Sequence, residues 1–334
     1  MKYYHYLTLI ILVLVTAGCP DSTVETDNPI ATNPQKFDIT WTQLTNMPNP
    51  QGWGGLNACI LNNKIYVVGG FSDQAIVGDV SVYDPATDTW ERKSPLNTAR
   101  WGHTSNVVNG KIYVMGGCSG ASGKALKSIE VYDPEKDLWE LSGEMALGRI
   151  GAGSAVVDGK IYMVAGCDAE PPEQAFNNVD CYDTDNKEWQ ICEVLPVATS
   201  YLSATALNGK IYAFGGTDGL NNDGLPSIFE YDISKNNWIQ KTDLKTARWG
   251  HSTCGNGELI FCIGGVSDGT SAALKKVEVY SPSKDSVYKA TDMVFQRMVL
   301  ATCAYNDRIY TFGGALNYPS YLRIAVTEVG ELNK

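Results

Sequence analysis

A glycine pair recurs six times in this chain, and successive copies are 47 to 50 residues apart. In the third copy alanine replaces the first glycine. The pairs are Gly69–Gly70, Gly116–Gly117, Ala165–Gly166, Gly215–Gly216, Gly264–Gly265 and Gly313–Gly314. A fixed period of this length is typical of repeat architectures, so each copy predicts one structural unit.

Each repeat contains sequence for four short strands. An apolar run with a central aromatic or apolar residue, such as Lys64–Val68, precedes the glycines and predicts a strand. A turn pair such as Asn109-Gly110 stands before that run and predicts a two-residue hairpin. After the glycines, a Tyr-Asp turn leads to a tryptophan, as from Tyr83 to Trp90, and predicts a second hairpin. Four antiparallel strands in a repeat of this length form the blade of a β-propeller.

The sixth repeat ends without its tryptophan. A matching tryptophan, Trp41, lies near the other end of the chain, 49 residues before Trp90. We therefore expect an N-terminal strand to complete the last blade, since closure removes free sheet edges. The predicted fold is all-β, a six-bladed propeller over residues 37–334 with four antiparallel strands per blade.

The double glycine, the tyrosine before it and the spacing from Tyr-Asp-Pro to tryptophan resemble the kelch repeat. The resemblance covers residues 37 to about 330 and implies a kelch β-propeller. It implies little about activity, because propellers host unrelated functions.

The N-terminal segment is typical of an export signal. Residues 1–18 contain Lys2, the apolar stretch Leu7–Val15 and small residues before Cys19. The Ala-Gly-Cys ending resembles a bacterial lipoprotein signal, which implies that Cys19 is lipidated; simple cleavage and an uncleaved anchor are the alternatives. Residues 19–36 are polar and contain prolines, and they predict a flexible tether. The expected location is the cell envelope, lipid-anchored to a membrane and facing the periplasm or the surface.

The charge of the chain limits its partners. The net charge is −11 and there is no basic run, which argues against nucleic acid. The same charge argues against adsorption onto anionic lipid, so a membrane would be contacted only through the N-terminal lipid. We expect a monomer without a cofactor.

Eight cysteines follow Cys19. Export would permit disulfides, and the candidate pairs are Cys118 with Cys167 and Cys181 with Cys192. None has the spacing of a metal site. Three others share a repeat position that the remaining copies fill with small residues, so buried free thiols are expected at Cys59, Cys254 and Cys303.

Four arginines share the position 16 residues before the glycine pair, in loops that ring the mouth of the predicted channel: Arg100, Arg149, Arg248 and Arg297. Trp53 and Thr199 fill this position in the other two repeats. Arginine suits bidentate recognition of carboxylates and phosphates, and the same loops carry aromatic surfaces at Trp53, Trp101, Tyr201 and Trp249. The sequence leaves two interpretations open. In one, the four arginines form a shared anion-binding ring. In the other, they are structural and bond to loop carbonyls or to aspartates after the glycines: Asp73, Asp168, Asp218 and Asp268.

A metal site is not expected. His103 and His251 occur in a repeated Arg-Trp-Gly-His segment and fall on opposite walls of the channel, so structural hydrogen bonds are the simpler interpretation. The oxygen-rich loop Asp218–Gly224 lacks the ligand order of a helix-loop-helix calcium site.

Two functions remain open. Short, regular loops favour a binding module that presents its channel-mouth face to a protein or an acidic carbohydrate. The alternative is a carbohydrate-active enzyme, because some exported bacterial kelch propellers are sialic acid epimerases (mutarotases) and resemble this chain in blade number. That resemblance implies an acid/base glutamate, for which Glu170 and Glu173 are the nearest candidates. The chain lacks the long insertions of that family, so no catalytic residue is assigned and binding is favoured.

Overall fold

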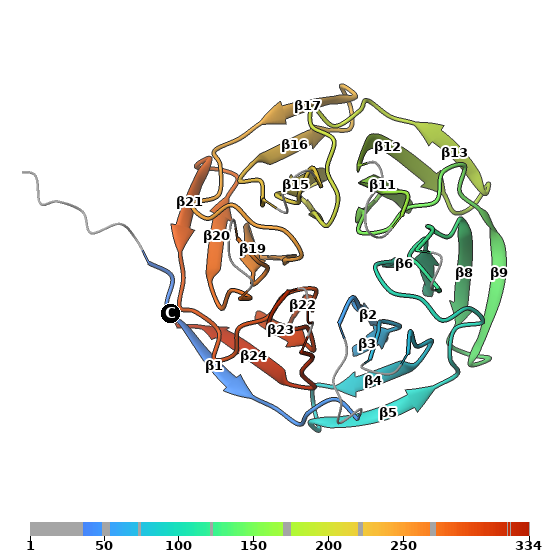
Figure 1. Ribbon diagram of the computed structural model, residues 1–334, viewed down its shortest axis with the longest axis horizontal. Helices are drawn as coiled ribbons and strands as arrows, with labels where there is room; N and C mark the ends of the chain where they lie inside the picture. Colours follow the sequence, from blue (N-terminus) through green and yellow to red (C-terminus); the bar gives the residue numbers. More distant parts are fainter. Residues whose placement is uncertain are drawn as a thin grey trace, which may run out of the picture. The chain divides into compact units, whose positions relative to one another are not determined.

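Six four-stranded antiparallel sheets are arranged as blades around a central axis (Figure 1). The computed structural model describes residues 36–48, 54–72, 75–120, 123–169, 175–219, 223–267, 272–318, 320 and 322–333. Within these residues the chain forms 24 strands and no helix. The predicted all-β, six-bladed propeller is confirmed.

Each blade contributes one strand to each of four layers around the axis. The innermost strands are β2 (Asn57–Leu61), β6 (Thr104–Val108), β10 (Gly153–Val157), β14 (Ser203–Leu207), β18 (Ser252–Asn256) and β22 (Ala301–Tyr305). The second strands are β3 (Lys64–Val68), β7 (Lys111–Met115), β11 (Lys160–Cys167), β15 (Lys210–Phe214), β19 (Leu259–Ile263) and β23 (Arg308–Phe312). The third strands are β4 (Val80–Asp84), β8 (Ser128–Asp133), β12 (Ala175–Asp183), β16 (Ile228–Asp232), β20 (Val277–Ser281) and β24 (Thr327–Leu332). The outermost strands are β5 (Thr89–Lys93), β9 (Leu138–Glu144), β13 (Glu188–Ile191), β17 (Asn237–Gln240), β21 (Ser286–Lys289) and, in blade six, β1 (Ile39–Gln43).

Strand β1 closes the propeller by pairing with β24, as the position of Trp41 predicted. Ile39 lies opposite Leu332, and Trp41 lies opposite Gly330. A Cβ atom on Gly330 would lie 3.0 Å from the indole of Trp41, so glycine leaves the room that the ring fills. The Trp41 indole N–H also donates a 3.0 Å hydrogen bond to the carbonyl of Thr291, which follows the outer strand of blade five. The first strand of the chain therefore fastens blade six to blade five.

The glycine pairs lie where consecutive blades touch. Gly116 has φ +69°, and a Cβ atom there would lie 2.5 Å from the carbonyl oxygen of Arg149 in the next blade. Gly117 donates a 2.8 Å hydrogen bond to that same oxygen. A left-handed backbone and the close approach of a neighbouring chain segment therefore both favour glycine at Gly116, although Ala165 fills the same position in blade three with φ +57°.

Apolar side chains fill the space between adjacent sheets rather than one central core. One cluster joins Tyr162 and Val164 of blade three to Ile211 and Phe229 of blade four. No part of the described chain forms a helix with the length and hydrophobicity that a membrane crossing requires.

Candidate functional site

Six backbone hydrogen bonds form a closed ring at the mouth of the channel. Each blade contributes one residue, whose N–H donates to the residue of one neighbouring blade and whose carbonyl accepts from the other. The donor–acceptor distances are 2.6 to 2.9 Å. We call this ring the collar, and its members are Gly55, Gly102, Gly151, Tyr201, Gly250 and Val299.

The collar requires a left-handed backbone at every position. Its φ values lie between +46° and +64°, a region that glycine adopts without a steric penalty. Four of the six members are glycine. Tyr201 and Val299 are the exceptions, and the β-branched Val299, with φ +46°, is an outlier of the kind that concentrates at functional sites.

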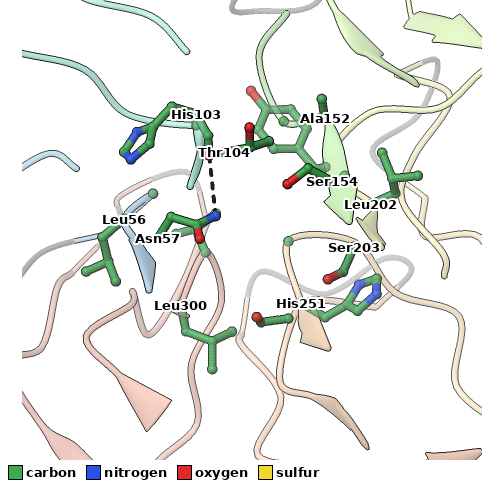
Figure 2. A pocket seen from close by; sticks show the side chains of 18 of the residues that line it. Leu56, Asn57, His103, Thr104, Ala152, Ser154, Leu202, Ser203, His251 and Leu300 are labelled. Atoms are coloured by element: carbon green, nitrogen blue, oxygen red, sulfur yellow. Dashed lines mark hydrogen bonds between the residues drawn. The ribbon is translucent and has the colours of Figure 1, made fainter. Parts of the chain in front are cut away.

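A cavity of about 200 Å³ lies in the channel, lined by the collar and the first residues of the innermost strands. Figure 2 shows the side chains of Asn57, Ser154 and Ser203 converging on it from three blades. Its described lining contains no Asp, Glu, Lys or Arg side chain. The described lining is therefore neutral and polar, although the protein is acidic.

The hydroxyl groups of this wall bond to one another. The Ser203 Oγ lies 2.8 Å from the Thr253 Oγ1, and the Ser252 Oγ lies 2.8 Å from the Thr302 Oγ1. The Ser154 Oγ donates a 3.0 Å bond to Asn106. A hydroxyl carries one donor and two acceptor lone pairs, so these groups keep hydrogen-bonding capacity toward the channel.

Of the four aromatic residues that the sequence placed at the channel mouth, the three described ones lie in or beside the collar. The ring of Tyr201 is stacked on Trp101 at 6.5 Å between centroids and lies 5.7 Å from Trp249. Trp249 is almost fully buried, whereas Trp101 and Tyr201 are partly exposed and line the cavity. Trp53 lies outside the described residues.

The four arginines do not face the channel space. Each is at most 2% exposed, and the guanidinium group donates to the carbonyl at the end of its own second strand. Each also forms an ion pair with a carboxylate of the third strand: Arg100 with Glu130, Arg149 with Asp180, Arg248 with Glu278 and Arg297 with Glu328. Burial lowers the pKa of Arg297 to about 10, against the opposing effect of Glu328. The guanidinium groups thus serve internal contacts, and their carboxylate partners differ from the aspartates that the sequence suggested.

The chain itself carries the signal that the sequence interpretation missed. An acidic residue stands 30 or 31 positions after each of the four arginines. The two blades without the arginine lack the acid too, because Ser81 and Phe229 stand at that position of the third strand in blades one and four. An unpaired buried charge is strongly unfavourable, so the two residues occur together or not at all.

Blade three carries the shorter acid, and a cavity of about 350 Å³ lies beside it. In blade two the carboxylate of Glu130 accepts bonds of 2.7 and 3.0 Å from the N–H groups of Asn97 and Thr98. The corresponding segment of blade three, Ala146–Leu147, lines the cavity, and among the described interactions no bond joins it to Asp180. The side chain of Asp180 is 24% exposed, whereas that of Glu130 is fully buried.

His103 and His251 are buried and turned away from the centre of the channel (Figure 2). Each ring packs against the first glycine of the preceding blade's pair, Gly69 and Gly215 respectively. Burial and the charge of the neighbouring arginine lower the pKa of each imidazole to about 3. Contact with the backbone of Val68 or Phe214 in the preceding blade opposes this shift only in part. Both histidines are therefore neutral at physiological pH.

All eight described cysteines are free and buried. Neither candidate pair is bonded in the structure. Cys118 and Cys167 both pack against Ile150, and their thiols are directed at backbone carbonyls of their own loops. Cys181 and Cys192 lie in one apolar cluster as thiols. The three cysteines at the shared repeat position are buried thiols, as expected, and burial raises the pKa of Cys59 and Cys254 to about 12.

The described residues bring no three His, Cys, Asp or Glu side chains together in a way that could hold a metal ion. Glu170 and Glu173 lie outside the described residues, as do Asp73, Asp268 and part of the loop Asp218–Gly224.

Comparisons with known proteins agree on the repeat. Two overlapping stretches, residues 11–196 and 102–314, match the family model described as the KLHDC2/KLHL20/DRC7 Kelch-repeats domain. Similar curated proteins include Kelch-like ECH-associated protein 1A of Danio rerio, 37% identical over 81 residues, which are 23% of this chain and 13% of that protein. Kelch-like protein 15 of Homo sapiens is 33% identical over 101 residues, 25% of this chain and 16% of that protein. The matched stretches thus span less than a fifth of these relatives.

A solved structure titled "Structure of YjhT" superposes with a TM-score of 0.74 and 15% sequence identity. The superposition covers 85% of this chain and 95% of the other. At this level of identity the likeness shows the fold alone.

Proposed function

Because this chain belongs to the kelch-repeat β-propeller family, we propose that it is a non-catalytic binding module that recognises a protein partner through its channel-mouth face. The observation that carries this is the neutral cavity within the collar, whose described lining offers no carboxylate, lysine or arginine for acid/base work. General acid/base catalysis needs a titratable group beside the reacting atoms, and the two histidines there have a pKa of about 3 and face away. The described lining of the cavity contains no carboxylate that would favour the epimerase, and the candidates Glu170 and Glu173 lie outside the described residues.

The buried arginines also change the expected ligand. Their positive charge is already matched by carboxylates inside the blades, so the face offers no free guanidinium ring to an acidic carbohydrate. The partner is therefore expected to contact the channel-mouth face through uncharged groups.

Site-specific photocross-linking tests this proposal. A benzophenone amino acid would replace Lys124, an exposed residue between β7 and β8 at the channel-mouth end, and in a matched variant Lys136, an exposed residue of the hairpin at the opposite end. We expect one protein species to cross-link from position 124 and not from position 136. Equal yields from both positions, or a cross-link from position 136 alone, would contradict the proposal.

We propose further that residues 1–36 deliver the module to the cell envelope and anchor it through a lipid on Cys19. The basis is the sequence of residues 2–19, with its apolar stretch and Ala-Gly-Cys ending. A tethered propeller would meet its partner at the membrane surface.

A further inference from the structure

We infer that the cavity within the collar binds a small, uncharged polyhydroxy ligand, a neutral monosaccharide or polyol. The inference goes beyond the proposed function, because it adds a small ligand in the cavity to a protein partner on the surrounding face. It is argued from the size of the cavity, from its lack of charge and from the kind of hydrogen-bonding groups that line it.

The size of the cavity limits the ligand. Its volume of about 200 Å³ is below the range of roughly 300–1,000 Å³ that is usual for drug-sized ligands. A single sugar ring is a ligand of the appropriate class, whereas an oligosaccharide or a folded peptide is too large to enter.

The lack of charged side chains in the described lining argues against an ionic ligand. An anion would lose its hydration without gaining a cation, because Arg100 and Arg248, the arginines nearest to the two histidines, are already bonded to Glu130 and Glu278. A cation would find no carboxylate in the described lining. A neutral polar molecule avoids both costs.

The polar groups of the cavity wall can both donate and accept hydrogen bonds, as sugar hydroxyl groups do. Asn57, Ser154, Ser203 and Ser252 are partly exposed and come from blades one, three, four and five. In the pairs Ser203–Thr253 and Ser252–Thr302 either hydroxyl can be the donor, so each can turn a donor or an acceptor toward the ligand. Sugar hydroxyls are likewise both donors and acceptors. Trp101 and Tyr201 add aromatic surface at the rim, against which the apolar face of a sugar ring can pack.

Matched neutral and acidic sugars provide the test. The full-length protein would be titrated by calorimetry and ligand-observed NMR with glucose, galactose and myo-inositol, and with glucuronate and galacturonate, which replace the C6 hydroxymethyl group by a carboxylate. We expect saturable binding of at least one neutral compound, with the matching uronate at least 10-fold weaker. Absence of binding by all three neutral compounds, or equal or tighter binding of the uronates, would overturn the inference.

Two conservative variants connect binding to the cavity. Ser203→Ala and Asn57→Ala should each weaken sugar binding by roughly 2- to 10-fold, the effect of one lost neutral hydrogen bond. Ser286→Ala, on the outer strand β21, is the control and should bind as the parent does. Unchanged affinity in both cavity variants would also overturn the inference. The photocross-linking result is independent of the sugar titration, so a propeller that cross-links from position 124 but binds no sugar keeps the proposed function and loses only this inference.

Discussion

The backbone N–H of Gly55 donates a 2.8 Å hydrogen bond to the carbonyl oxygen of Val299, which joins blade one to blade six at the channel mouth. This bond completes the collar. The propeller is therefore closed twice, at its rim by β1 pairing with β24 and at its axis by a ring of peptide groups. Hydrogen bonds in such a ring polarise one another, and the ring fixes the geometry of the cavity beneath it.

Gly151→Ala should destabilise the propeller more than Gly159→Ala. Both glycines belong to blade three and have φ values of +60° and +73°, so each variant incurs about 1–2 kcal/mol for a left-handed residue with a Cβ atom. At Gly151 the new Cβ atom would also lie 2.8 Å from the backbone nitrogen of Tyr201, whereas nothing lies within 4 Å at Gly159. Denaturant unfolding should show about 1–3 kcal/mol more loss for Gly151→Ala. Equal losses would show that the collar tolerates a local shift.

Replacing one member of a buried ion pair should lower the free energy of unfolding, and replacing both members should recover most of that loss. Arg248→Thr alone leaves Glu278 buried without its cation, and should lower the free energy of unfolding by about 3–5 kcal/mol. Blade four shows another solution, Thr199 with Phe229, so the double variant Arg248→Thr with Glu278→Phe should recover most of that loss. A double-mutant cycle by chemical denaturation measures the coupling. Additive losses would mean that the pairing is not what holds these residues together.

Asp180→Glu should stabilise blade three. The longer side chain enters the adjoining cavity and can reach the N–H groups of Ala146 and Leu147, as Glu130 reaches the same groups in blade two. One or two added hydrogen bonds predict a gain of about 1 kcal/mol, read as a higher melting temperature. The reciprocal variant Glu130→Asp should lose at least as much, because it leaves the N–H groups of Asn97 and Thr98 without their carboxylate acceptor. A lower melting temperature for Asp180→Glu would show that the cavity cannot admit the extra methylene group.

The free energy of unfolding should fall as the pH drops below about 6.5, because His103 and His251 take up protons in the unfolded chain but stay neutral in the folded protein. Their folded pKa of about 3 lies below the unfolded value of about 6.5, so the unfolded state binds more protons within this window. The free energy of unfolding should decrease by up to about 1.4 kcal/mol per pH unit for each histidine. Carboxylates with a lowered pKa, such as Asp137, act in the same direction but only below about pH 4.

A double variant isolates that histidine effect. Leucine stands at the same register in blades one, four and six, so His103→Leu with His251→Leu should fold. Urea unfolding between pH 6.5 and 5 should show a clear slope for the parent and a nearly flat line for the variant. An equal slope in both proteins would assign the acid sensitivity to other groups.

Cys19→Ser should release the protein from the membrane fraction or block its processing, because the thiol is the group that a lipoprotein signal acylates. Membrane fractionation and mass spectrometry of the mature N-terminus make the measurement, with Cys59→Ser as a control for cysteine loss elsewhere. An unchanged partition, with no lipid mass on the parent protein, would reject the anchor.

The repeat made most of the fold predictable, because its glycines, turns and tryptophans recur at one period. Trp41 also gave the closure of blade six correctly. The arginines were harder to interpret. Their shared register was evident, but their burial depends on how the third-strand carboxylates lie in space, which spacing alone does not give. The matching acids, Glu130 and its equivalents, were present in the sequence as a second periodic signal. The collar was harder to predict from the sequence, because Tyr201 and Val299 interrupt the glycine pattern of the other four members.

The pairing of β1 with β24 also places a condition on biosynthesis. Ile39 is among the first described residues to be made and Leu332 among the last, yet the two lie opposite each other. During translation β1 must remain without its partner while five complete blades are made, and a chain that stops early keeps an open edge on both sides of the gap. A chain truncated before blade six should therefore aggregate or be degraded more readily than the full-length chain. Ring closure would then favour the survival of chains that contain both β1 and β24.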